Sequence, residues 1–143
     1  SIVDRVDILH DVGESLNTQI DLGQIEGGFI QGMGWLTNEE LWWNDKGQLK
    51  THAPSTYKIP LASDRPRVFN IELAKWSKNK ERTIKRSKAV GEPPLMLAIS
   101  VHEALSMAAS YSGTNKVRPI LNSPATSEKI LECIEIARIK SLG

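Results

Sequence analysis

A helical pattern interrupted by five glycines is the feature that most constrains how this chain can fold. The apolar positions recur at roughly helical spacing: Ile20, Ile25, Phe29, Met33 and Leu36. The glycines within the same stretch are Gly23, Gly27, Gly28, Gly32 and Gly34. Asn17 is a suitable cap for the helix, but each glycine would cost about 1 kcal/mol relative to alanine in an exposed helix interior. Local propensity alone would not select this helix, so we expect something to approach its backbone closely.

Strand patterns occur on both sides of this helix. Residues 2–10 alternate between apolar and polar, and the predicted strand ends at the turn Asp11-Val12-Gly13. Residues 40–43 and 48–51 are typical of a hairpin around a glycine-containing loop, and Val68 to Leu73 alternate again. The sequence therefore predicts a sheet of about four strands.

Two further helices are expected in the second half of the chain. Leu95 to Ser110 has an apolar helical pattern that ends at Gly113, and the last helix covers about Ser127 to Lys140. Strands mixed with helices and joined by short loops favour an α+β fold, with a mixed sheet packed against helices in two layers. With 143 residues, the chain is expected to form a single domain, residues 1–143. It begins without Met and with a strand pattern already under way, so we expect a fragment of a longer protein.

Composition limits the classes of partner. Lys and Arg number 18 against 17 Asp and Glu, so overall charge gives no reason to expect binding to nucleic acid or an anionic membrane. The single cysteine, Cys133, forms no internal disulfide, and no zinc-type spacing of Cys or His is present. The longest apolar run, Leu95 to Ile99, is too short to cross a bilayer. These features predict a cytoplasmic protein without a structural metal site.

Glu92, in Gly91-Glu92-Pro93-Pro94, is the sharpest candidate for chemistry. A residue before proline is driven towards an extended conformation, and Pro94 suits the first position of the helix that follows. We therefore expect a stiff backbone that holds the carboxylate ahead of a helix N-terminus, where the ionised form that a general base needs is favoured. The plain alternative is an exposed acid that only caps the helix.

The glycines of the predicted helix also have two possible interpretations. Gly23-Gln24 and Gln31-Gly32 would bring backbone and amide groups against a flat polar cofactor, since glutamine both donates and accepts hydrogen bonds. Alternatively, the small residues only let two elements pack tightly. Cys133 is expected to be a buried small residue of an amphipathic helix, and Trp35, Trp42 and Trp43 to be core or interface residues.

A basic stretch containing Trp76 precedes Gly91. Its cations are Lys75, Lys78, Lys80, Arg82, Lys85, Arg86 and Lys88. Such a stretch could bind single-stranded nucleic acid by charge and stacking, but a solvated basic loop is the favoured interpretation.

Several motifs, in their order along the chain, resemble the xanthine dehydrogenase and aldehyde oxidase family. The motifs are Asp11-Val12-Gly13, Ser15-Leu16-Asn17, Gly23-Gln24-Ile25-Glu26-Gly27-Gly28 and Gln31-Gly32-Met33-Gly34. Two later ones, Pro54 to Pro60 and Ser87 to Pro94, are similar to the xanthine dehydrogenase branch of that family. The resemblance covers nearly the whole chain, with departures at Thr18 and Ser127, which affect helix starts only.

The resemblance implies a molybdenum hydroxylase that oxidises hypoxanthine and xanthine towards urate on a molybdenum–molybdopterin cofactor. Glu92 matches the family's general base, which removes a proton from a metal-bound hydroxide as that oxygen attacks the purine carbon. Gln24 matches a pterin contact, Gly23 and Gly27 would permit the cofactor's approach, and Lys88 and Gly91 would support it. Another molybdenum hydroxylase, acting on an aldehyde or a different N-heterocycle, is the nearest alternative.

The resemblance also implies partners. The remaining cofactor contacts and substrate clamps would come from the part of the molybdenum subunit that precedes these motifs, so the chain alone is expected to be inactive. FAD and 2Fe-2S clusters are expected in other regions or subunits, since one cysteine cannot hold a cluster.

Overall fold

The chain divides into two compact units in the computed structural model, which describes residues 1–76, 78–113 and 118–139. The sheet unit consists of Ile2–Gly32 and Leu61–Ala98. The helical unit consists of Ser1, Met33–Pro60 and Ile99–Gly143. In the described part of the chain, none of the helices combines the length and the apolar character needed to span a bilayer. The expectation of a single domain stays a prediction.

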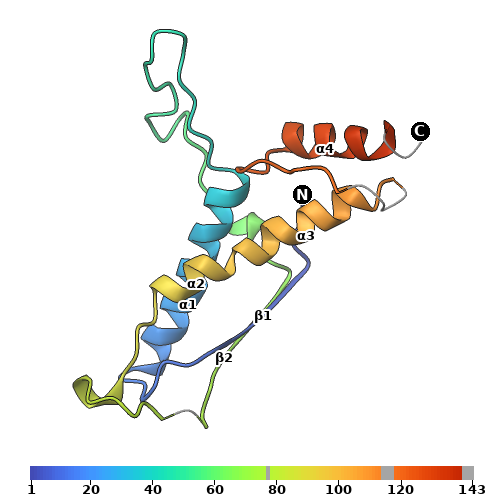
Figure 1. The fold of residues 1–143 in the computed structure, drawn as a ribbon. Coiled ribbons are helices and arrows are strands. Elements are labelled where there is room, and N and C mark those ends of the chain that lie inside the picture. The colour runs from blue at the N-terminus through green and yellow to red at the C-terminus, as the bar shows by residue number, and fades with distance from the viewer. Residues whose placement is uncertain (77, 114–117, 140–143) are drawn as a thin grey trace. The chain divides into compact units, whose positions relative to one another are not determined.

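The sheet unit is built on two parallel strands (Figure 1). β1 (Arg5–His10) pairs with β2 (Val68–Leu73) in a register that runs from Arg5 opposite Val68 to His10 opposite Leu73. Parallel strands need a long connection, and the first part of helix α1 (Thr18–Thr37) lies within it. Phe29 of α1 packs on Phe69 of β2 with ring centroids 5.5 Å apart. The strands and this helix thus share an apolar core, as the α+β expectation requires.

Helix α1 begins as its sequence predicts. The Asn17 side-chain oxygen accepts hydrogen bonds from the backbone amides of Gln19 and Ile20, at 3.1 and 3.2 Å. Ile25 and Phe29 are almost fully buried. The predicted cap and apolar face are both confirmed, except that Ile20 at the first turn is exposed.

The expected mixed sheet of about four strands is wrong for the described residues, where the sheet has two strands, both parallel. The predicted hairpin does turn back, with the Lys50 amide donating to the Trp42 carbonyl at 2.8 Å, but it forms only one isolated bridge, between Trp43 and Leu49. Trp35, Trp42 and Trp43 are 50%, 54% and 51% exposed, so they are not core residues; the alternative, that they are interface residues, stays a prediction. A two-stranded hairpin without a packed apolar face gains too little burial to extend its strands.

The predicted helix from Leu95 to Ser110 is two helices. α2 (Glu92–Leu97) ends at Ala98, whose backbone amide donates a hydrogen bond to the Leu95 carbonyl, three residues back. α3 (Ile99–Ser110) follows. A bond of this kind tightens the last turn and interrupts the regular ladder. Two short 3-10 turns, at Ala62–Asp64 and Ile84–Arg86, complete the elements that precede α2.

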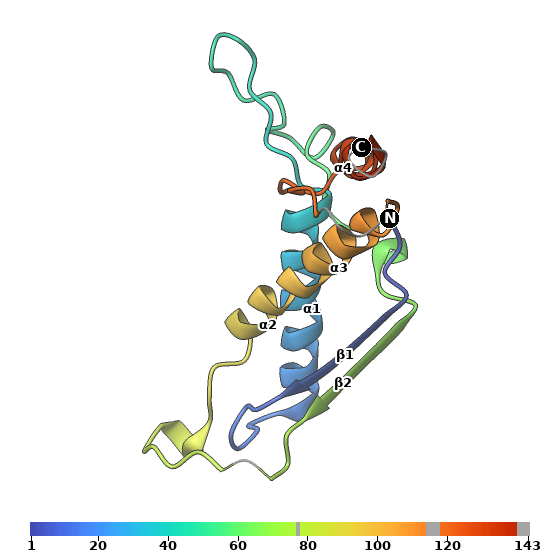
Figure 2. The same cartoon turned by 45° about the vertical axis from the view of Figure 1, so that its right-hand side comes forward.

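Within the helical unit, α3 and α4 (Ser127–Ile139) lie side by side (Figure 2). Their buried core consists of Ala109, Leu121, Ala125 and Cys133. Burial raises the pKa of the Cys133 thiol, because the thiolate would lose its hydration. Cys133 is therefore the small buried residue that was expected, and α4 matches its predicted range except for Lys140, which lies outside the described residues.

Candidate functional site

The glycines of α1 in the sheet unit fall into two groups. A Cβ added at Gly28 would lie 2.6 Å from the Gly91 carbonyl oxygen, and one at Gly32 would lie 2.9 Å from the Ala98 Cβ. At these two positions glycine permits tight packing against the segment that contains α2, which supports the plain interpretation. A Cβ at Gly23 or Gly27 would meet nothing within 4 Å. Close packing within the described structure therefore explains only half of this set.

Gly23 and Gly27, whose lack of a side chain is not explained by packing, line a pocket of about 630 Å³ in the sheet unit. It is lined by Gly23, Gln24, Gly27, Gly28, Gln31, Ala89, Val90, Gly91, Glu92 and Leu95. One wall is the glycine-rich face of α1, and the other is the segment that leads into α2. The fold thus brings together residues that are more than sixty positions apart in the sequence.

Glu92 lines this pocket but does not have the backbone that was predicted for it. It is the first residue of α2 instead of an extended residue ahead of the helix, and Pro94 is third instead of first. Gly91 is helical too, with φ −81° and ψ −40°, so its backbone is one that any residue could adopt. The first turn of a helix needs no internal amide donors, so both prolines fit it, and the buried Pro94 packs beside Gly28. The Glu92 side chain remains exposed at the pocket.

Gln24 lies directly across from the Gly91 backbone. A Cβ added at Gly91 would be 3.1 Å from the Gln24 Oε1 atom, so any larger residue would push against this amide. Gln24 and Gln31 are both exposed on α1 and both line the pocket. Amide groups beside the bare backbone of Gly23 and Gly27 suit a flat heterocycle with hydrogen-bonding edges, so these residues fit a pterin.

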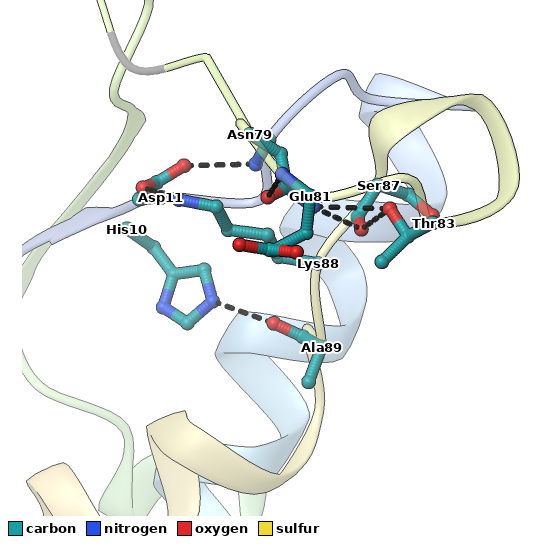
Figure 3. A network of polar contacts seen from close by, with 9 residues as sticks. His10, Asp11, Asn79, Glu81, Thr83, Ser87, Lys88 and Ala89 are labelled. Carbon is teal, nitrogen blue, oxygen red and sulfur yellow. Dashed lines mark hydrogen bonds and ion pairs between the residues drawn. The ribbon is translucent and has the colours of Figure 1, made fainter.

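Lys88 does not line the pocket. Its ammonium group pairs with the Asp11 carboxylate (Figure 3), and its backbone amide donates to the Val12 carbonyl at 2.8 Å. One residue later, the Ala89 carbonyl accepts a hydrogen bond from His10 Nε2 at 3.3 Å, which requires the proton to be on that nitrogen because a carbonyl only accepts. We call residues 10–14 together with 86–89 the clasp.

The clasp extends on both sides of the ion pair. Gly13 bridges Ser87 in antiparallel fashion, and the Glu14 amide donates to the Arg86 carbonyl at 3.2 Å. Gly13 has φ +64°, and its missing side chain leaves room for the Lys88 chain, which would otherwise lie 3.2 Å from a Cβ. The conformation and the space both require glycine here.

A second set of hydrogen bonds secures the basic stretch to the clasp. The Asn79 side-chain amide and the Thr83 hydroxyl both donate to the Ser87 carbonyl, at 3.2 and 2.7 Å (Figure 3). The Arg86 guanidinium donates to the Asn79 carbonyl at 3.0 Å. Two cations of the basic stretch, Arg86 and Lys88, thus bind other groups of the protein itself. The tryptophan of the same stretch, Trp76, is 74% exposed.

Sequence reasoning missed His10 and Asp11 as residues that hold the pocket wall. Asp11 was assigned only a turn, and His10 was assigned no chemistry. Because Asp11 and Lys88 are 77 positions apart, no local spacing signals their pairing. Within residues 1–76, 78–113 and 118–139, His, Cys, Asp and Glu form no cluster of three or more suited to a metal ion.

Residues 2–66 match the family of molybdopterin cofactor-binding domains. The chain is 48% identical over 132 residues to the xanthine dehydrogenase/oxidase of Mus musculus, covering 88% of this chain and 10% of that protein. It is 45% identical over 137 residues to xanthine dehydrogenase 2 of Arabidopsis thaliana, again covering 88% of this chain and 10% of the relative.

A solved structure, the quinoline 2-oxidoreductase of Pseudomonas putida 86, has a similar fold. It superposes with a TM-score of 0.76 at 29% sequence identity, over 89% of this chain and 15% of that one. The chain therefore spans about a tenth of the length of the curated relatives it matches. Over most of its length, this chain is homologous to the C-terminal molybdopterin-binding portion of xanthine dehydrogenase, a molybdenum hydroxylase.

Proposed function

We propose that this chain is part of a molybdenum hydroxylase that oxidises hypoxanthine and xanthine towards urate. In this proposal Glu92 is the general base, and Gln24, Gly23, Gly27 and Gly91 form one wall of the molybdopterin site. Lys88 supports that wall. The proposal is supported by one observation above all, the pocket that joins the open glycine face of α1 to Glu92.

The bound cofactor would supply the redox and oxygen-transfer chemistry, and the residues of this chain have three tasks beside it. Gln24 donates and accepts hydrogen bonds at the edge of the pterin, next to the bare backbone of Gly23 and Gly27. The exposed Glu92 carboxylate takes up the proton released as the new carbon–oxygen bond forms. The packing of Pro94 beside Gly28 holds the start of α2, and with it Glu92, against α1.

Other parts of the enzyme complete this site in the proposal. The pocket is lined by residues of α1, of α2 and of the segment that leads into α2, so the preceding part of the molybdenum subunit would supply the remaining cofactor contacts and the substrate clamp. FAD and 2Fe-2S clusters in partner regions or subunits would receive the electrons. We place the complete enzyme in the cytoplasm, and we expect the chain alone to be inactive.

The test of the base is Glu92→Gln in the complete enzyme, because glutamine keeps the shape of the side chain but cannot take up the proton. We expect molybdenum and pterin contents to be unchanged and turnover of xanthine to fall by at least about a hundredfold, the usual contribution of a general base. Glu26→Gln is the matched control, since Glu26 is exposed on α1 outside this pocket. Near-normal turnover of the Glu92 variant at full molybdenum occupancy would show that the base assignment is wrong.

The pterin contact is tested by Gln24→Ala, with Gln19→Ala as its control. Gln19 is exposed on the same helix but does not line the pocket. We expect the Gln24 variant, and not the Gln19 variant, to bind less pterin per subunit. Equal pterin contents would remove Gln24 from the site.

A hydroxylase for a different N-heterocycle is the second candidate, favoured by the structural likeness to quinoline 2-oxidoreductase. The identity to xanthine dehydrogenases is higher, at 48% against 29%, so we place the purine first. Relative kcat/KM values for xanthine, hypoxanthine, quinoline and an aldehyde on the complete enzyme decide between them.

A further inference from the structure

We propose that the clasp is a positioning device, in which Asp11 and His10 act through Lys88 and Ala89 to set where Glu92 stands in the pocket. The proposal rests on the proposed function of Glu92 and deepens it. It assigns Lys88 a role through its partner Asp11 instead of a contact with the cofactor.

The argument begins with the distance along the chain. The clasp ends at Ala89, and the pocket wall runs from Ala89 to Glu92, so only Val90 and Gly91 separate the fixed backbone from the proposed base. Gly91 has no side chain whose packing could fix the position of this short link. The position of Glu92 therefore depends on the segment before it and on the packing of α2 after it.

The clasp restrains that segment at successive residues. Backbone bonds join Arg86 and Lys88 to the 12–14 segment, the ion pair joins Lys88 to Asp11, and His10 holds the Ala89 carbonyl. His10 is 7% exposed, and the Lys88 and Asp11 side chains are about one-third exposed, at 35% and 33%. A partly shielded ion pair with an adjacent buried hydrogen bond restricts rotation more than an exposed surface pair does.

The clasp is also fixed to the sheet. His10 is the last residue of β1 and lies opposite Leu73 of β2, so the atom that holds Ala89 belongs to a paired strand. The Asp11 Oδ1 atom accepts a hydrogen bond from the Gly13 amide at 2.8 Å, which orients the carboxylate towards the turn. Groups held on regular elements position a catalytic group more accurately than groups on free loops.

A misplacement of about 1 Å at a reacting group can cost about a hundredfold in rate, so loosening the clasp should appear in kcat. In the complete enzyme, we expect Lys88→Met and Asp11→Asn each to lower kcat per molybdenum by about ten- to a hundredfold. KM and pterin content should stay unchanged. Methionine keeps most of the apolar stem of Lys88, and Lys88→Arg should restore most of the activity because it renews the ion pair.

Two comparisons separate positioning from other roles. Because both single substitutions break the same contact, the double variant should be no slower than either one. Amide hydrogen exchange of residues 89–91, measured in the complete protein with and without cofactor, should speed up in both variants. Lys80→Met is the matched control, since Lys80 is an exposed cation of the same stretch, and it should change neither quantity.

The possible results are distinguishable. Unchanged kcat per molybdenum in both single variants would overturn the proposal. Loss of pterin from Lys88→Met but not from Asp11→Asn would overturn it as well, by showing that Lys88 contacts the cofactor directly. If both single variants yield less folded protein but keep the wild-type kcat per molybdenum, the clasp has only a structural role and the proposal is wrong. Glu92→Gln, measured alongside, tests the base itself, so its failure would be seen separately from the failure of the clasp.

Discussion

Alanine substitutions at the adjacent glycines Gly27 and Gly28 provide the sharpest test of the packing in the sheet unit. The two residues follow one another in α1, so the same substitution brings the same intrinsic gain in helix propensity, about 1 kcal/mol. They differ in surroundings, because a Cβ at Gly27 meets nothing within 4 Å, whereas one at Gly28 would lie 2.6 Å from the Gly91 carbonyl oxygen.

The difference between the two variants isolates the steric cost. A separation of 2.6 Å forces the backbone of Gly91 to move, since neither atom belongs to a flexible side chain. Overpacking of this kind typically costs about 1–3 kcal/mol. We therefore expect Gly27→Ala to be more stable than Gly28→Ala by about 1–3 kcal/mol, with Gly27→Ala at least as stable as the wild type.

The assay is urea unfolding of the 143-residue chain, followed by circular dichroism at helical wavelengths. Equal stabilities of the two variants would refute the close approach of Gly28 to Gly91, and with it one wall of the pocket. A second measurement concerns cofactor loading in the complete enzyme. There Gly27→Ala should lower the pterin content, because its new methyl group enters the pocket that the helix face leaves open.

Three further predictions concern the cap of α1, the Glu39–Tyr57 pair and the buried thiol. Asn17→Ala should destabilise the chain by about 1 kcal/mol in urea unfolding, because two amides lose their acceptor; no change would contradict the cap. The Tyr57 hydroxyl donates to the Glu39 carboxylate at 2.5 Å, and this bond raises the pKa of Tyr57 above its ordinary value of 10.0. The bond therefore contributes its full stabilisation below pH 10, and this contribution is lost as pH rises through the folded-state pKa of Tyr57. The free energy of unfolding should fall over this alkaline range in the wild type, and this fall should be absent in Tyr57→Phe. An identical pH profile of the two proteins would argue against the pair. Cys133 should react with iodoacetamide only after unfolding, as measured by peptide mass spectrometry, and fast labelling of the native protein would contradict its burial.

Local patterns were sufficient for much of the secondary structure. The cap at Asn17, the apolar face of α1 and the two alternating segments that became β1 and β2 each depend on neighbours within a few residues. The residue set around Glu92 and Gln24 came from motif resemblance, and the fold places both at one pocket. The roles assigned to them stay proposals.

Other features depended on contacts that no local pattern contains. The hairpin strands failed to extend because Trp42 and Trp43 gain little burial, which their apolar character alone does not reveal. Glu92 became helical although a proline follows it, because the packing of α2 on α1 outweighs the preference for an extended conformation.

The sequence by itself determined the start of α1, its buried apolar face and the two segments that became β1 and β2, since composition and spacing express local preferences directly. Only the tertiary structure decided which glycines are packed and which are open, because that depends on a segment more than sixty residues away. It likewise decided that Asp11 and His10 restrain the segment before Glu92. Pairings between distant residues follow from the path of the whole chain, and a single sequence does not encode them in any local spacing.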